Sequence, residues 1–447
     1  MKKRWIIFMA IVVIISFIGV CLPETAEIWE PDDITNPANV AWMITATIFV
    51  LMMTPGLSFF YGGMVRKKNV ISTILQSFIA MGVISVIWVV FGFSFAFGDD
   101  IGGFIGNPAT FFMFNDVGAK SCDYLTPTIP LALFALFQMK FAIITPSLIT
   151  GSFAERVRFS AYLVFITLFC IFVYCPLAHW TWHPDGFLRQ MGVVDFAGGI
   201  VVHASSGIAA LCGAIFLGKR KEKSPAPANI PFVLLGAAML WLGWFGFNAG
   251  SSLAADGVAV KAFLNTNTAS ATAMLVWMFF DCLCGRKPSA MGAAIGAVVG
   301  LVAITPSAGY VTVGESIFIA LVTTIICNIA VFWKNKTSLD DALDVFPTHG
   351  VGGIVGTILT GVFVHGLLDG NYQVFWAHLG AVVIVTVYTF TVTYALYWIT
   401  NKMIVMRVSE KSEQIGLDIS QHDERYGEFD TNRELAEYFE EPDKSAK

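Results

Sequence analysis

Eleven long apolar stretches follow one another beyond residue 38, and each is long enough to cross the hydrocarbon core of a bilayer. Backbone N–H and C=O groups find no water at that depth, so a spanning segment must pair them internally. We therefore expect an all-α polytopic protein of the cell membrane with eleven transmembrane helices. The expected spans are residues 41–65, 70–98, 128–150, 159–178, 196–218, 231–250, 263–284, 289–305, 309–333, 345–367 and 375–400.

The composition excludes several other classes of protein. Hydrophobic residues make up 56% of the 447 residues and charged residues 13%, which is too apolar for a soluble globule. The net charge of -5 comes partly from the tail at 412–447, and no basic stripe indicates nucleic-acid binding. The eight cysteines form no CxxC pair and no zinc spacing, so we predict neither a disulfide framework nor a metal site.

Basic residues are distributed unequally between the loops. The loops after odd-numbered spans hold thirteen lysines and arginines, whereas those after even-numbered spans hold three. Loops rich in Lys and Arg stay in the cytoplasm. We therefore expect the first span to begin outside the cell and residues 401–447 to form a cytoplasmic tail.

Residues 1–23 have the pattern of a signal peptide or a signal anchor, with Lys2, Lys3 and Arg4 ahead of the apolar run Trp5–Leu22. Either interpretation places residue 30 outside the cell. Cleavage is the preferred one, although no A-x-A pattern is present.

Two histidines lie among glycines and small residues within apolar stretches, His203 in DFAGGIVVHASSG and His349 in DVFPTHGVGG. A buried imidazole needs a partner or a polar path. Ten of the spans divide into two sets of five that enter from opposite sides, as in an inverted repeat, and each histidine then lies in the fifth span of its set. His203 is eight residues beyond Asp195, roughly 12 Å along a helix and near the bilayer midplane. The alternative is that each histidine bonds locally and only ties helices together.

Five strings in the spans and their loops are specific enough to compare with known families. They are TPGLSFFYGGMVRKKN (54–69), FQMKFAIITPSLITGSFAERVRFSA (137–161), DFAGGIVVH (195–203), GWFGFNAGS (243–251) and VFPTHGVGGIVG (345–356). They resemble the Amt/Mep/Rh ammonium transporters, specifically the Amt branch. The resemblance covers about residues 38–420 and implies an ammonium transporter membrane domain at 38–400. It also implies a trimer in which each eleven-helix subunit has a narrow hydrophobic pore with paired histidines, here His203 and His349.

The resemblance also implies an outer cation site at Trp182, Phe141 and Ser251. Aromatic faces attract cations, and a serine hydroxyl accepts a hydrogen bond from an ammonium N–H. The alternative is an interfacial aromatic belt, for which Trp180 would serve as well as Trp182. Phe141 and Phe247 match the family's stacked phenylalanines, although phenylalanines in apolar spans usually only pack.

Two charged residues lie close to these motifs. Asp195 resembles an acidic residue near the outer site, and we expect a structural role in which it caps the start of its helix. Lys140 is an unusual charge within a predicted span, and we expect it to serve structure or a subunit contact, since a cation beside the pore would repel ammonium.

The expected function is therefore an ammonium transporter or channel for nitrogen uptake that needs no cofactor and is not an enzyme. Ammonium would bind outside and pass the histidines as ammonia-like nitrogen, with methylammonium as an analogue. The alternative is an ammonium sensor that signals through its tail. The tail reads GLDISQHDERYGE at 416–428, close to the family's G-L-D-x-x-x-H-G-E-x-A-Y until His422. A PII-type regulatory protein is therefore a candidate partner at the cytoplasmic face.

Overall fold

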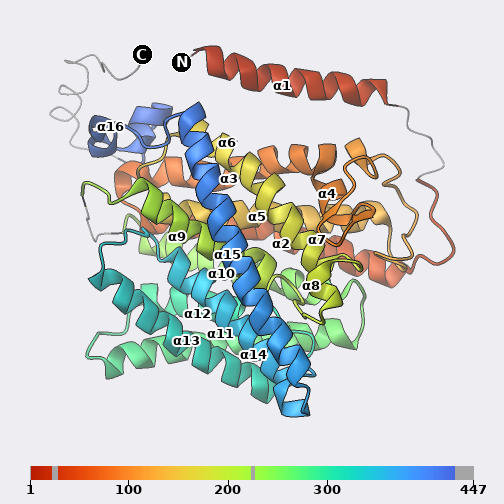
Figure 1. Cartoon of the computed structure of the whole chain (residues 1–447). Coiled ribbons are helices and arrows are strands. Elements are labelled where there is room, and N and C mark those ends of the chain that lie inside the picture. The colour runs from red at the N-terminus through yellow and green to blue at the C-terminus, as the bar shows by residue number, and fades with distance from the viewer. Residues whose placement is uncertain (1, 23–28, 223–226, 428–447) are drawn as a thin grey trace.

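The computed structural model describes residues 2–22, 29–222 and 227–427, and helices dominate it (Figure 1). Several long helices are joined end to end by short π-helical turns, labelled η here together with the 3₁₀ turns. The elements as far as residue 217 are α1 (Lys2–Cys21), α2 (Pro37–Met64), η2 (Lys67–Asn69), α3 (Val70–Ile87), η3 (Trp88–Gly92), α4 (Phe93–Phe97), β1 (Asp100–Ile101), β2 (Ile105–Gly106), η4 (Phe112–Phe114), α5 (Leu131–Phe153), α6 (Phe159–Phe169), η5 (Cys170–Tyr174), α7 (Cys175–Trp182), α8 (Phe187–Gln190), η6 (Gly199–Ala204) and α9 (Ser205–Leu217).

The second half of the chain repeats the pattern of long helices. Strands are limited, in the described residues, to the β1–β2 hairpin, which is antiparallel with Asp100 opposite Gly106. The later elements are α10 (Ile230–Ala249), η7 (Gly250–Ser252), α11 (Gly257–Leu283), α12 (Ala290–Ile304), α13 (Val313–Lys336), η8 (Phe346–Gly350), α14 (Val351–Phe363), η9 (Leu367–Asp369), α15 (Tyr372–Met403), α16 (Glu410–Ile415) and η10 (Asp418–His422).

Each predicted span coincides with a helical segment, but the number of spans stays a prediction. In the part of the chain that the structure describes, ten helical segments are long and apolar enough to cross a membrane, and α1 is one of them. Two predicted spans fall outside this set. The helix α12 has 15 residues, and α11 is interrupted by polar residues such as Asn265 and Thr266.

Side-chain caps explain where several helices begin. Asn36 accepts hydrogen bonds from the N–H groups of Ala38 and Asn39 at the start of α2, and Pro37 occupies the first helical position. At the start of α13, Thr312 and Glu315 form a reciprocal capping box. These contacts satisfy N–H groups that have no partner within the helix.

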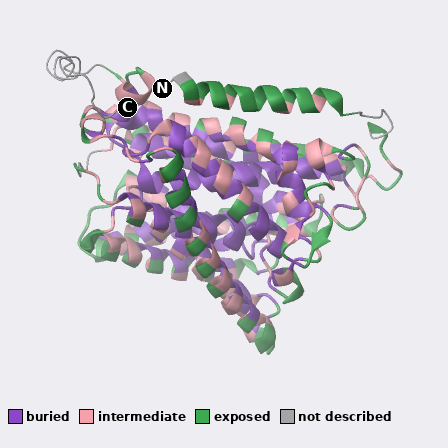
Figure 2. Cartoon of the chain, turned by 45° about the horizontal axis from the view of Figure 1, so that its top comes forward, coloured by how far each residue is buried: buried purple, intermediate pink, exposed green. Residues whose placement is uncertain are grey.

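The core lies between the long helices, and α1 lies outside it. Figure 2 shows buried residues concentrated in the interior, whereas α1 is exposed along its length. Two contacts fix its first turn to the start of α6. The guanidinium of Arg4 donates to the hydroxyl of Ser160 at 3.0 Å, and the ring of Trp5 lies 6.5 Å from that of Phe159.

The two helices that carry the predicted pore histidines cross at glycines. His203 lies on η6 at the start of α9, and His349 lies on η8 at the start of α14. A Cβ atom on Gly207 would lie 2.0 Å from the backbone nitrogen of Gly350, which no side chain can occupy. The close approach brings the two π-helical turns together, and such turns are frequent at functional sites.

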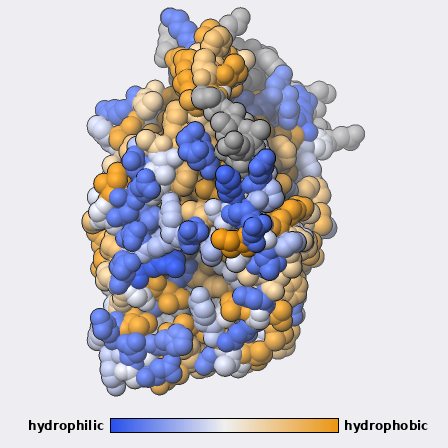
Figure 3. Space-filling model, turned by 90° about the vertical axis from the view of Figure 1, so that its right-hand side faces the viewer, coloured by the Kyte–Doolittle hydropathy of each residue, from blue (hydrophilic) through white to orange (hydrophobic). Residues whose placement is uncertain are grey.

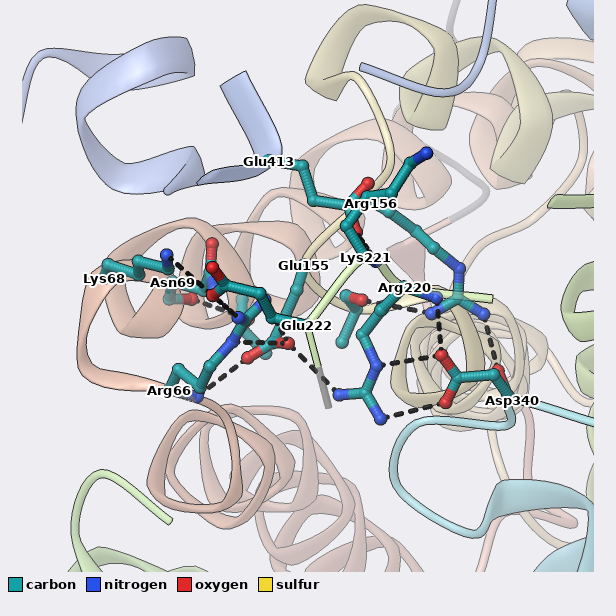
Figure 4. Close-up of polar contacts among 12 residues, drawn as sticks. Arg66, Lys68, Asn69, Glu155, Arg156, Arg220, Lys221, Glu222, Asp340 and Glu413 are labelled. Carbon is teal, nitrogen blue, oxygen red and sulfur yellow. Dashed lines mark hydrogen bonds and ion pairs between the residues drawn. The ribbon is translucent and has the colours of Figure 1, made fainter. Parts of the chain in front are cut away.

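Buried ion pairs join the loops at one end of the molecule (Figure 4). Glu155, 1% exposed, is bound by Arg66 at 2.9 Å and by Arg220 at 3.1 Å. The guanidinium of Arg220 also binds Asp340 at 2.9 Å. Because these residues come from four separate loops, the network fixes the loops relative to one another. We refer to Arg66, Glu155, Arg220 and Asp340 as the loop network.

The chain beyond α15 docks on the same end of the molecule. Glu413 accepts a hydrogen bond from the N–H of Lys221 at 2.6 Å and pairs with Arg407 at 2.9 Å. Asp418 accepts from the N–H groups of Ile71 and Ser72 at 3.1 and 2.7 Å, at the start of α3. The described part of the predicted tail is therefore docked on the bundle, and residues 428–447 lie outside the described residues.

Candidate functional site

A cavity of about 450 Å³ opens at the other end of the molecule, near α8. Figure 3 shows this face, with polar side chains gathered across it and apolar ones toward its edges. Trp182, Phe141 and Ser251 all line the cavity, although they come from α7, α5 and η7. The structure thus brings together the three residues predicted for an outer cation site.

Two stacked phenylalanines lie between this cavity and the interior. The rings of Phe141 and Phe247 have centroids 4.1 Å apart and planes inclined by 19°. Trp182 meets Phe141 edge to face at 5.8 Å and 87°. Phe141 is 1% exposed and Phe247 is fully buried. The hydroxyl of Ser251 donates to the Phe247 carbonyl at 2.8 Å, so its lone pairs are free to accept a hydrogen bond.

The two candidate tryptophans have different surroundings. The indole N–H of Trp182 donates to the Asp195 carbonyl at 2.9 Å, which holds the ring at the cavity wall. Trp180 does not line the cavity; its indole donates to the Phe104 carbonyl at 2.7 Å, and its ring lies 4.9 Å from that of Phe187. Of these two tryptophans, Trp182 is therefore the one that lines the cavity.

The carboxylate of Asp195 caps η6. Its two oxygens accept four backbone N–H groups at 2.6–3.2 Å, from Gly198, Gly199, Ile200 and Val201. Gly198 has a φ of +110°, and a Cβ there would lie 2.7 Å from the Val202 side chain, so this tight turn requires glycine. The side chain is 6% exposed, and all of these bonds are to backbone.

His203 and His349 meet beneath the phenylalanines. Their Nδ1 atoms lie 3.3 Å apart, and their ring planes are inclined by 27°. His203 is fully buried and His349 is 3% exposed. Both line a narrow cavity of about 10 Å³ whose other walls are mostly apolar, formed by residues such as Leu57, Ile144 and Phe247.

The contact between the two Nδ1 atoms determines what the pair presents to the cavity. Only one of the two nitrogens can donate in this hydrogen bond, so the other must accept. In a neutral pair, one Nε2 then carries a hydrogen and the other a lone pair. The Nε2 of His203 has no partner in the structure, although it is buried. The pair therefore offers both a donor and an acceptor to a small polar molecule.

Lys140 belongs to neither cavity. Its side chain is 8% exposed, and its Nζ atom lies 3.7 Å from the sulfur of Met139. Among the described residues no carboxylate lies within ion-pair distance of it.

Sequence reasoning missed two residues that support the histidines, Asp341 at the start of the turn that carries His349 and Trp244 against the ring of His203. Asp341 precedes His349 by eight residues, as Asp195 precedes His203, and its carboxylate accepts the Phe346 N–H at 2.7 Å. Burial raises the pKa of Asp341 to about 6. The repeated spacing was the available signal. Trp244, whose ring is stacked 5.2 Å from that of His203, had no comparable signal outside the GWFGFNAGS string.

Known proteins match this chain over nearly its whole length. The sequence profile of the Ammonium Transporter Family matches residues 41–426. A putative ammonium transporter of Methanothermobacter thermautotrophicus is 45% identical over 401 residues, which cover 87% of this chain and 98% of that relative.

Solved structures agree in fold. Saccharomyces cerevisiae Mep2 superimposes with a TM-score of 0.80 at 34% identity, covering 84% of this chain and 88% of Mep2. A structure described as a sensor Amt protein superimposes with a TM-score of 0.79 at 30% identity, covering 86% and 98% of the two chains. Because the profile, the relative and the fold agree over nearly the same residues, the chain belongs to the ammonium transporter family.

Proposed function

We propose that this chain recruits ammonium at Trp182, Phe141 and Ser251 and conducts it, as ammonia-like nitrogen, past His203 and His349. The observation that carries the proposal is the order of the groups: an open cavity with aromatic walls, then two stacked phenylalanines, then a histidine pair in a narrow apolar cavity. Each of these groups suits the charge that the transported nitrogen carries at that depth.

The outer cavity suits a cation. A ring face attracts an ammonium ion by about 0.5–2 kcal/mol per contact, and the Ser251 hydroxyl accepts one of its N–H bonds. Deeper in the protein a full charge is unfavourable by several kcal/mol, and the mainly apolar inner cavity offers few ligands for it. The ion therefore gives up or shares its proton before or at the histidines.

Histidines also explain selectivity. Potassium has a size similar to that of ammonium but has no N–H donors and no proton to lose. A lone pair on a buried imidazole accepts a hydrogen bond from ammonium but makes no comparable contact with potassium. A neutral histidine pair thus discriminates where the width of the pore does not.

The histidine role is tested by His203→Ala and His349→Ala, with His365→Ala as the control because its side chain is 87% exposed. Ammonium-driven current and ammonium-limited growth of a transporter-deficient host are measured. We expect both pore variants to lose selective flux and the control to match the unmodified protein. Full, selective flux in either pore variant would refute the role.

The outer site is tested separately by Trp182→Leu and Ser251→Ala. Because these residues act before the pore, we expect the KM for methylammonium uptake to rise by about three- to tenfold while the maximum rate changes little. A fall in maximum rate at constant KM would contradict a recruitment role.

We also propose a homotrimer with eleven spans and a five-plus-five inverted repeat in each subunit, the first span entering from outside and the tail in the cytoplasm. The crossing of the two histidine helices supports the repeat, and the excess of Lys and Arg in the loops after odd-numbered spans supports the orientation. Both cavities are built from a single chain, which fits one pore per subunit. The mass of the purified complex and the accessibility of single cysteines in the loops test these assignments.

The docked tail supports a PII-type regulatory protein as a partner, because the segment from Glu413 to Asp418 contacts the loops at the cytoplasmic end of the pore. Co-purification with a PII protein under nitrogen-replete and nitrogen-poor conditions tests this. The similarity to a sensor Amt protein keeps a sensor as the alternative. Flux in liposomes separates the two functions, since a sensor binds ammonium without proportional transport.

A further inference from the structure

The outer end of α7 holds a buried histidine that lines neither cavity. His179 lies one helical turn before Trp182 and is fully buried, yet both of its ring nitrogens have polar partners. Nδ1 lies 3.0 Å from the backbone oxygen of Ala96, in the last turn of α4. Nε2 lies 2.9 Å from Oδ1 of Asp100, the first residue of β1.

These partners determine the protonation of His179. A backbone oxygen only accepts, so Nδ1 carries a hydrogen. Oδ1 of Asp100 also accepts the N–H of Gly103 at 2.7 Å, which suits an ionised carboxylate. Burial raises the pKa of Asp100, but the hydrogen bonds from His179 and Gly103 lower it further, to below its ordinary value. Nε2 therefore donates as well, and His179 is an imidazolium paired with Asp100.

The other titratable groups nearby leave this ion pair isolated. The ring of His183 is stacked on that of His179 at 4.4 Å, but its Nδ1 accepts the N–H of Asp185 at 3.1 Å, so His183 is neutral. The carboxylate of Asp185 lies 3.9 Å from His183, and Tyr124 contacts the edge of that ring at 5.8 Å. Arg189, on α8, is the remaining charged side chain that acts on His183.

The ion pair ties the wall of the outer cavity to its support. It links the end of α4, the β1–β2 hairpin and α7. The same hairpin accepts a second bond from α7, from the Trp180 indole to the Phe104 carbonyl at 2.7 Å. The N–H of His183 in turn bonds to the carbonyl of His179 at 3.1 Å across the turn that carries Trp182. Trp182 is thus carried on a helical turn whose start is fixed at His179.

We propose that His179 is a positioning residue whose pairing with Asp100 holds Trp182 in place, so that recruitment of ammonium weakens when either partner of the pair is replaced. Without the carboxylate or the imidazole, α7 loses this bond to the β1–β2 hairpin. The inference rests on the proposed function, in which Trp182 recruits ammonium from outside.

The test is methylammonium uptake by the full-length protein in cells, with KM and the maximum rate measured together with surface expression. In Asp100→Asn a neutral amide replaces the carboxylate that pairs with His179, so we expect KM to rise by about three- to tenfold at an unchanged maximum rate.

Two further variants complete the test. His179→Gln loses the same pair and should raise KM to a similar extent, whereas His183→Gln leaves the pair intact and should keep the KM of the unmodified protein. An unchanged KM in Asp100→Asn, or a fall in its maximum rate at constant KM, would overturn the inference even if His179→Gln fails to fold. Absence of uptake in the unmodified protein would instead reject the proposed function.

Discussion

At the scale of the residue, Lys140 has the environment least suited to its charge. It lies within α5, is 8% exposed, and has no carboxylate partner among the described residues. Replacing buried charges by apolar side chains of similar volume is often neutral or stabilising. We expect Lys140→Met to raise the free energy of unfolding by about 1–2 kcal/mol and to leave uptake unchanged, because the side chain lines neither cavity.

Thermal unfolding of the detergent-solubilised protein checks this prediction, together with methylammonium uptake. Lys140→Gln is the control, since it removes the charge but keeps a polar group. Its melting temperature should lie between those of the unmodified protein and Lys140→Met. A lower melting temperature or lost uptake in Lys140→Met would show that the charge serves a purpose, such as a subunit contact.

The sequence predicts which residues form the candidate site better than it predicts how their side chains contact one another. The sequence indicates His203 and His349, because an imidazole in an apolar span is conspicuous. It does not indicate that the two Nδ1 atoms face each other at 3.3 Å, because that contact depends on the crossing of two helices distant in the chain. The Asp100–His179 pair is hidden for the same reason, since 79 residues separate its members.

At the scale of the element, the crossing of the two histidine helices depends on Gly207. A Cβ at this position would meet the backbone of Gly350 at 2.0 Å, and backbone atoms cannot move aside as a flexible side chain can. We expect Gly207→Ala to separate α9 from η8 and to abolish uptake. The matched control is Gly82→Ala in α3, where nothing lies within 4 Å of the new Cβ and alanine should stabilise the helix by about 0.5–1 kcal/mol.

Surface expression, melting temperature and uptake are measured for both glycine variants. If Gly207→Ala transported normally, the crossing would not be what brings the histidines together.

The loop network allows a prediction with a pH dependence. Asp340 is 4% exposed, and burial raises its pKa, but the hydrogen bond and charge of Arg220 lower it further, so its pKa lies below the ordinary value. A lowered carboxylate pKa contributes stability that is present above the unfolded pKa of about 3.9 and is lost as the pH falls through the folded value. We expect Asp340→Asn to lower the free energy of unfolding by about 3 kcal/mol at neutral pH.

The melting temperatures of the unmodified protein and Asp340→Asn should therefore differ at pH 7, and the difference should begin to shrink only below about pH 4. Glu222→Gln is the control: Glu222 also pairs with Arg66, at 2.8 Å, but its side chain is 56% exposed, so its loss should matter by less than about 1 kcal/mol. Equal effects of Asp340→Asn and Glu222→Gln on the melting temperature would mean that burial of the loop network adds nothing to stability.

The sequence predicts the long helices better than it predicts the turns that join them. The apolar stretches predict the long helices because period and length are local properties. The π-helical turns at η6 and η8 are not predictable in this way, since an extra residue per turn leaves the apolar pattern almost unchanged. For α12 the helix itself is predictable, but its length of 15 residues does not establish that it crosses the membrane.

At the scale of the whole molecule, α1 is the part least bound to the rest. It lies along the edge of the bundle, most of its described side chains are exposed, and its first turn contacts the start of α6 through Arg4 and Trp5. A charge-assisted hydrogen bond stabilises by about 3 kcal/mol at most, and one ring pair by about 1.5 kcal/mol at most. The bundle and both cavities are complete without this helix.

We therefore expect the mature protein to lack residues 1–23, and we expect uptake to survive their exchange for an unrelated cleavable signal. Intact mass of the purified subunit checks the first expectation and uptake checks the second. An uncleavable version of residues 1–23 serves as the control, and it should fold and transport as well, because α1 covers neither cavity. Loss of uptake on exchange would show that α1 is instead a permanent part of the bundle, held through its contacts with α6.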